Sequence, residues 1–218
     1  MALELIDKQD NFEVIRDQIA AILVTEVANQ MLLATTPADY KLRIYSERSN
    51  PWEQYLNTVT DSSPLVNVWF DNINFMQDKS NIMERQAGRA TYNVDCYGYA
   101  ASEDISGGGH IAADEKAALE VQRAIRLTRN ILMAAENTYL QARGLVWQRW
   151  IRDITVFQPP SITGNQVQRV QGGRIKLEVL FNEFSPQYTP EELELLTVTV
   201  QRDYDGQIIL NTNYDYTA

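Results

Sequence analysis

Two segments of the chain repeat apolar residues at the spacing of an α-helix. The first follows Asp10 and Glu13, which have the spacing of a capping box. Its apolar positions recur at steps of about three and four, a pattern that predicts a helix from about 11 to 34: Phe12, Ile15, Ile19, Ile22, Leu23 and Met31. Thr35-Thr36-Pro37 should end this helix, because proline disfavours helical backbone in the residue before it.

The second helical pattern is predicted from about 112 to 142. One face carries Ala117, Val121, Ala124, Ile131 and Ala135. Asp114 and Glu115 near its start and Arg143 at its end suit the helix dipole, and Gly144 is a plausible cap. Ser106-Gly107-Gly108-Gly109, just before it, is expected to be a flexible connector.

Other segments alternate apolar and polar residues, as half-buried strands do. Strands are predicted at about 41–45, 65–70, 91–97, 150–157 and 174–181, of which 65–70 is a short β-prone run without clear alternation. The third of these places Tyr92, Val94 and Cys96 on one face. Near the end of the chain, 196–202 and 207–210 flank Asp203-Tyr204-Asp205-Gly206, whose Asp-Gly pair favours a hairpin turn.

The order of these elements predicts an α+β fold. Short connections between adjacent strands favour a mainly antiparallel β-sheet, packed by two long α-helices and followed by a C-terminal β-hairpin. We expect a single domain over 1–218, with long loops at about 46–64, 76–89 and 158–172. A chain of 218 residues is long enough to bury one sizeable core.

The composition and charge of the chain argue against some classes of function. No apolar run approaches the roughly 18 residues of a membrane-spanning helix, and the acidic start of the chain is unlike a signal peptide. We therefore expect synthesis in a cytoplasm and no membrane partner. The formal charge of −10 argues against a surface that holds nucleic acid by neutralising phosphates, although DNA could still pass by the chain without being bound.

Residues that could carry chemistry all favour a structural interpretation. His110 is the single histidine and adjoins three glycines, with no partner at the spacing of a catalytic triad. Cys96 lies on the apolar face of a predicted strand and cannot form an internal disulfide alone. The glycine run lacks the Walker pattern, and Asp203 to Gly206 lacks the closing glutamate of a calcium loop. No catalytic residue, cofactor or metal is therefore predicted.

A few features are candidates for contacts with other proteins. The second helix carries three arginines at intervals of three residues: Arg123, Arg126 and Arg129. They form either a solvated face of the helix or a contact for an acidic neighbour. The other candidate interface residues are Trp52 and Tyr55 in the 46–64 loop and the four turn residues Asp203, Tyr204, Asp205 and Gly206. Trp147 and Trp150 are more simply core or interface residues than a ligand-stacking platform.

The order of elements resembles the tail terminator, or tail-completion, proteins of long-tailed bacteriophages. The resemblance covers most of the chain, with Ala90 to Ala100 leading toward the second helix and Gly173 to Phe181 forming a late strand. It implies a virion protein of the tail or neck that forms a hexameric ring, caps the tail tube and joins it to the head. Implied partners are further copies of the chain, tail tube and sheath proteins, and head–tail connector or stopper proteins.

Two alternatives remain open from the sequence. Another neck, collar, head-completion or sheath-associated virion protein would share these features, and the added material at 46–64 and 158–172 fits such a role. A small-molecule-binding or enzymatic α+β domain would instead need a pocket with convergent polar groups. We further hypothesise that the acidic excess lines a channel through which DNA slides.

Overall fold

A computed structural model describes residues 8–55, 61–76, 85–105, 109–159, 169–184, 195–201 and 208–215. Residues 9–185 form one compact unit, and residues 1–8 together with 186–218 form a second. The expectation of a single domain therefore stays a prediction.

The first helix, α1, spans Asn11–Leu33, as predicted. The backbone N–H of Asp10 donates to the Glu13 carboxylate at 3.0 Å, which is half of the expected capping box. Ala34 is extended, and Pro37 opens a short 3-10 helix, η1, at Pro37–Tyr40. The buried face of α1 consists of Ile15, Ile19, Ile22, Leu23 and Val27.

The second helix, α2, spans Ala113–Met133 and is shorter than the predicted 112–142. Its last turn is capped by Asn137, a buried residue whose side-chain amide donates to the carbonyl of Ile131 at 2.9 Å. A 3-10 turn, η3, follows at Ala135–Asn137. Gly144 has a φ of 96° but lies well beyond the helix, in the turn that leads to the next strand.

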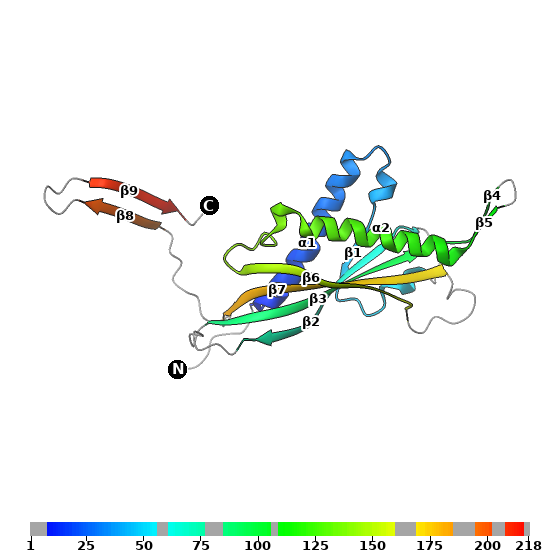
Figure 1. Ribbon diagram of the computed structural model, residues 1–218, viewed down its shortest axis with the longest axis horizontal. Helices are drawn as coiled ribbons and strands as arrows, with labels where there is room; N and C mark the ends of the chain where they lie inside the picture. Colours follow the sequence, from blue (N-terminus) through cyan, green and yellow to red (C-terminus); the bar gives the residue numbers. More distant parts are fainter. Residues whose placement is uncertain are drawn as a thin grey trace. The chain divides into compact units, whose positions relative to one another are not determined.

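Five strands form one mixed sheet in the order β1-β2-β3-β7-β6 (Figure 1). The strands are β1 (Arg43–Ser46), β2 (Leu65–Phe75), β3 (Arg85–Tyr99), β6 (Val146–Phe157) and β7 (Val170–Phe184). β1 pairs with β2 in parallel, and the other neighbours are antiparallel. β3 and β7 begin earlier than predicted, so 85–89 and 170–172 are strand within the segments expected to be loops. A short hairpin of β4 (Glu103–Ile105) and β5 (Gly109–Ile111) precedes α2.

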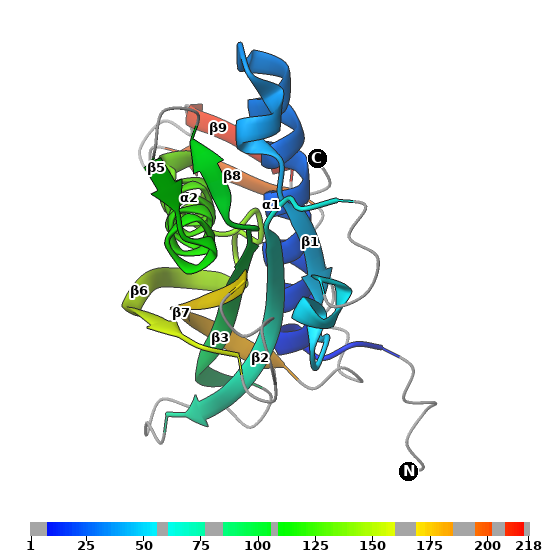
Figure 2. The same ribbon diagram turned by 90° about the vertical axis from the view of Figure 1, so that its right-hand side faces the viewer.

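Both helices cover the same face of this sheet (Figures 1 and 2). Tyr92, Val94 and Cys96 are fully buried in the resulting core, as their alternation predicted. Glycines on β3 and β7 allow α2 to approach the sheet closely. A Cβ atom on Gly98 would lie 2.6 Å from the carbonyl oxygen of Ala117, and one on Gly173 would lie 2.5 Å from a methyl group of Ile125.

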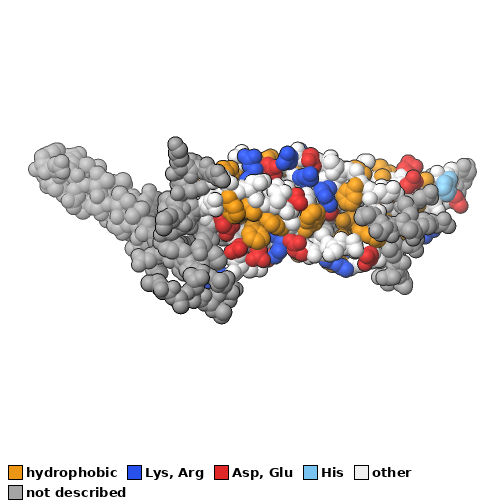
Figure 3. All heavy atoms as spheres, turned by 90° about the horizontal axis from the view of Figure 1, so that it is seen from below, with side chains coloured by type: hydrophobic (Ala, Val, Ile, Leu, Met, Phe, Trp, Pro, Cys, Tyr) orange, Lys and Arg blue, Asp and Glu red, His pale blue; other side chains and the backbone are white. Residues whose placement is uncertain are grey.

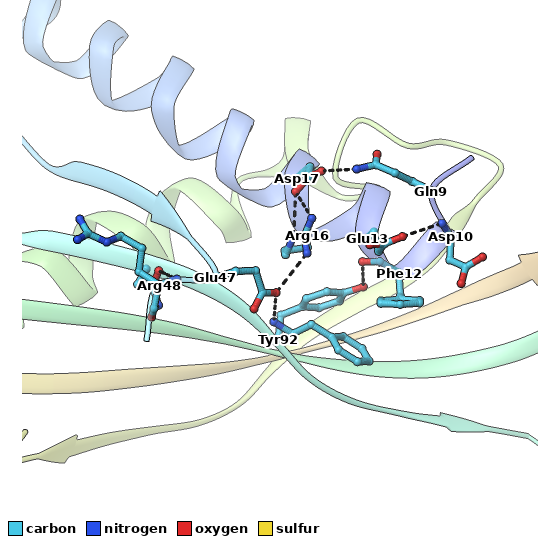
Figure 4. A network of polar contacts seen from close by, with 11 residues as sticks. Gln9, Asp10, Phe12, Glu13, Arg16, Asp17, Glu47, Arg48 and Tyr92 are labelled. Atoms are coloured by element: carbon cyan, nitrogen blue, oxygen red, sulfur yellow. Dashed lines mark hydrogen bonds and ion pairs between the residues drawn. The ribbon is translucent and has the colours of Figure 1, made fainter. Parts of the chain in front are cut away.

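A polar network ties the start of α1 to the sheet (Figure 4). Arg16 pairs with Glu47 at 3.3 Å, and the same Glu47 oxygen accepts the backbone N–H of Phe70 at 3.0 Å. The Tyr92 hydroxyl donates to the carbonyl of Phe12 at 2.8 Å. Glu47 has a φ of 53°, a left-handed backbone conformation that is costly for a non-glycine residue, and its contacts hold it there.

The C-terminal strands β8 (Leu195–Gln201) and β9 (Ile208–Asp215) pair with each other in an antiparallel hairpin. The predicted turn residues Asp203 to Gly206 lie outside the described residues. An α+β fold with a mostly antiparallel sheet, two long helices and a C-terminal hairpin is confirmed.

Glu183, near the start of α1, should make stability depend on pH. Burial and the nearby charge of Asp10 raise the pKa of this carboxyl to about 7, although it accepts the backbone N–H of Asn11. The folded state therefore favours the protonated carboxyl. The contribution of Glu183 to the free energy of unfolding is fully present below about pH 4.5 and is lost as pH rises through 7. At pH 8 we expect Glu183→Gln to be more stable than wild type by about 1 kcal/mol more than it is at pH 4.5. The value is kept small because the side chain is only partly buried.

Urea unfolding of both proteins at the two pH values tests this expectation. Asp153→Asn serves as the control, because Asp153 is also acidic and partly exposed but lies on β6. A difference between Glu183→Gln and wild type that is the same at both pH values would contradict the proposed cause.

Candidate assembly surfaces

One edge of the main sheet is open. β6 pairs with β7 on one side, and no strand within the described ranges pairs with its other side. Its exposed apolar side chains are Trp147, Ile154 and Val156, which keep 45%, 41% and 63% of their surface accessible. By register, Ile154 and Val156 share the helix-covered face with Ile175 and Gly173 of β7, but α2 does not cover them. The edge therefore offers both free backbone groups and apolar surface.

The C-terminal end of α1 is a second uncovered apolar surface. The last buried residue of the helix is Val27, and Leu32 and Leu33 are 86% and 79% exposed. Figure 1 shows this end of α1 extending past α2, away from the sheet. Two adjacent leucines at a projecting helix end are suited to contact with another polypeptide, since their burial would stabilise an assembly.

The face of the sheet opposite the helices carries a buried ion pair. Asp95 on β3 accepts two hydrogen bonds from the Arg174 guanidinium on β7, at 2.6 and 2.9 Å. It also accepts from the Trp69 indole at 2.9 Å and the Tyr97 hydroxyl at 3.3 Å. The Arg174 guanidinium stands 4.9 Å from the Trp69 ring centre and 5.4 Å from that of Phe157.

This cluster borders a hollow of about 330 Å³. Beside the pair, its walls include Trp52, Asn67 and residues 47–50. The most prominent polar groups already bond within the chain: Asp95 has four donors, and Asn67 exchanges hydrogen bonds with the backbone of Arg48 at 3.1 and 2.9 Å. Seen from this side, hydrophobic side chains lie among acidic and basic ones (Figure 3). These hydrogen bonds hold the side chains on this face of the sheet in place, and they leave few polar groups available to bind or convert a substrate.

The three predicted arginines of α2 do not form one straight stripe. Residues three apart on a helix differ by about 60° around its axis, so the three side chains spread over about 120°. Arg123 bonds to Glu120 and to the carbonyl of Asp39. Arg126 is exposed and borders a hollow of about 410 Å³ that also contains Glu26 and Glu136, and Arg129 is exposed.

The other candidate residues have varied positions. Trp52 and Tyr55 lie in a 3-10 helix, η2 (Pro51–Tyr55), where they are only 4% and 2% exposed and pack with Leu65, Tyr97 and Val170. Asp203, Tyr204, Asp205 and Gly206 lie outside the described residues. A role for these six residues and the three arginines in an interface stays a prediction.

His110 and Cys96, the two candidate catalytic side chains, each contact another side chain of the subunit. His110 is exposed on β5 and contacts Asp104 at 2.7 Å. Cys96 is buried beside Thr128, and burial raises the pKa of its thiol to about 12. Among the described residues, no cluster of three or more potential metal ligands occurs. None of their helices combines the length and apolar character needed to cross a bilayer.

The sequence pattern predicts β6 as a strand but does not indicate its edge position, because that position depends on which strands pair. It also missed the contact between Asp95 and Arg174. Both residues lie at polar positions of alternating strands, which indicates that each strand has a polar face. Only the register of β3 and β7 shows that the two residues are opposite each other.

No protein-family model matches this chain, and no curated protein matches it. By structure, the chain is similar to one chain of a solved structure described as "Virion of native gene transfer agent (GTA) particle". The two are 10% identical, with a TM-score of 0.43, over 77% of this chain and 93% of the other. A likeness at that level does not by itself establish a shared fold or function.

Proposed function

We propose that this chain is a structural virion protein of a tailed phage or phage-like particle, and that it acts as a tail terminator. In this role it forms a ring, with a hexamer expected, which caps the tail tube and joins it to the head. Its partners are copies of itself, tail tube and sheath proteins, and the head–tail connector or stopper. It is made in the host cytoplasm and resides in the virion without being an enzyme.

The observation that carries this proposal is the uncovered apolar surface on an otherwise well-packed fold. Leu32 and Leu33 on α1 and Val156 on β6 expose most of their surface, while the core between helices and sheet is closed. Such surfaces are typical of subunits that bury them against other copies. The order of helices and strands also supports the proposal, since it is the order on which the tail-terminator resemblance rests.

The first test is the mass of the purified protein in solution, measured by light scattering and followed by negative-stain imaging. Six-fold rings are the expected result. A protein that stays monomeric at high concentration would overturn the proposal, and a bound metabolite in native mass spectrometry would then identify the alternative. It would favour a small-molecule-binding domain that uses the hollow beside Arg174.

Another neck, collar, head-completion or sheath-associated virion protein is the nearest alternative. Such a protein would share the same uncovered surfaces, so the identity of the partner separates the two. Binding to assembled tail tubes favours the terminator, whereas binding only to head connectors favours a neck or head-completion role.

We further propose that acidic residues line the channel of the ring and reduce adhesion of DNA. A channel rich in lysine and arginine would contradict this.

The exposed arginines of α2 should contribute to assembly. Reversing Arg126 and Arg129 to glutamate is expected to raise the concentration for half-assembly about tenfold, which corresponds to about 1.4 kcal/mol, because a contact with an acidic neighbour would become repulsive. Arg123 is left unchanged, since it bonds within the chain. Light scattering over a concentration series measures the effect, and lysine at both positions is the control. Unchanged assembly in the reversed variant would indicate a merely solvated face.

A further inference from the structure

Among the described residues, nothing gives the open edge of β6 the usual protection over its last residues. Strand edges are commonly blocked by charges, bulges or covering segments. β6 has irregularities between Val146 and Gln148 and between Ile151 and Asp153, but from Ile154 to Phe157 it pairs continuously with β7. Within this stretch Ile154 and Val156 are exposed, and there is no charged residue. This end of β6 can therefore accept another strand through main-chain hydrogen bonds.

The same chain contains a second, two-stranded sheet at its C-terminal end. Strands β8 and β9, of seven and eight residues, pair with each other in a unit distinct from residues 9–185. An isolated two-stranded hairpin is at best marginally stable in water. Positions 196, 198 and 200 are Leu, Val and Val and alternate with Thr and Gln, which is the pattern of a strand that buries one face.

Charge also favours contact between these two elements. Residues 195–215, the hairpin with its connecting segment, contain three acidic residues and one basic residue, Arg202. Along β6 the charged residues are Arg149, Arg152 and Asp153, and Arg152 keeps 65% of its side chain exposed. An acidic hairpin is thus attracted to the edge that carries more positive than negative charge.

We propose that the C-terminal hairpin of a second copy of this chain adds to the free edge of β6 and extends the sheet from one subunit to the next. The inference rests on the proposed function, because a contact between two different surfaces of identical subunits forms a ring when the rotation between neighbours closes. Each subunit then donates one hairpin and accepts another.

Cysteine cross-linking between separate chains tests the contact directly. The native chain has one cysteine, Cys96, which is buried, so introduced cysteines report their own contacts. Thr155→Cys on β6 is mixed with Thr199→Cys on β8 or with Thr212→Cys on β9, and a mild oxidant is added. We expect disulfide-linked dimers in at least one mixture, absent from each variant alone and lost on reduction.

The two proposals can fail separately. If light scattering shows assembly but neither mixture cross-links, the hairpin contact is overturned while the ring remains. If chains that carry both cysteines form only internal disulfides, the hairpin binds its own subunit and the inference is overturned. If every variant and the wild type are monomeric, the proposed function fails as well.

A charge at the edge gives an independent readout. Val156→Lys should weaken assembly at least tenfold, because lysine at an exposed edge opposes strand addition. Leu119→Lys on α2, where the native side chain is 57% exposed against 63% for Val156, is the matched control and should assemble as wild type does. Equal assembly of the two variants would contradict the proposed contact.

Discussion

Asp95→Ala is expected to lower the free energy of unfolding by about 2–3 kcal/mol, less than the roughly 3–5 kcal/mol of breaking a fully buried ion pair from one side, because Arg174 keeps 29% of its side chain exposed. The Asp95 side chain is only 3% exposed, and removing it leaves the Arg174 guanidinium without its counter-charge. The Trp69 indole and the Tyr97 hydroxyl lose an acceptor as well. Urea unfolding measures the loss.

Two further variants separate the charge effect from a general loss of packing. Asp153→Ala removes a carboxylate that stands 3.9 Å from Lys176 and is 39% exposed, so it should cost less than about 1 kcal/mol. Removing both charges, with Asp95→Ala and Arg174→Met together, should recover part of the stability, since no unpaired charge is then left. A double variant less stable than Asp95→Ala alone would contradict this account.

The helices and strands could be predicted because their patterns are local. The apolar spacing of α1 and the alternation at Tyr92, Val94 and Cys96 both follow from a single buried face, and the structure confirms them. The end of α2 could not be predicted in the same way. Apolar residues continue past Met133, and the cap comes from Asn137, whose contact with Ile131 becomes visible only in three dimensions.

Which apolar residues lie at the surface of the subunit depends still more on the tertiary structure. The polar segment around Trp52 and Tyr55 favours an interface role for both residues, but both side chains are buried within the subunit. Leu33 lies on the same side of α1 as Ile15 and yet is exposed, and Leu32, also exposed, lies on a different side of the helix. Sequence periodicity indicates which face of a helix is apolar, whereas the length of the neighbouring layer decides how much of that face is covered.

Gly98→Ala is expected to cost about 2–3 kcal/mol in the free energy of unfolding, because it forces α2 away from the sheet. The new Cβ would lie 2.6 Å from the carbonyl oxygen of Ala117 and 3.0 Å from the backbone nitrogen of Val121. Both are backbone atoms of the helix and cannot rotate away, so the helix itself must move. Thermal or urea unfolding measures the loss.

Gly172→Ala is the matched control on the opposite face of the sheet. Its Cβ would meet the ring of Phe157 at 2.8 Å, and that ring belongs to a partly exposed side chain that can turn. We therefore expect a cost below about 1 kcal/mol there, since the backbone can stay in place. Equal losses at the two glycines would show that the close approach of α2 is not what requires Gly98. A larger loss at Gly98 would identify the contact between α2 and β3 as the point where the helix layer is fixed to the sheet.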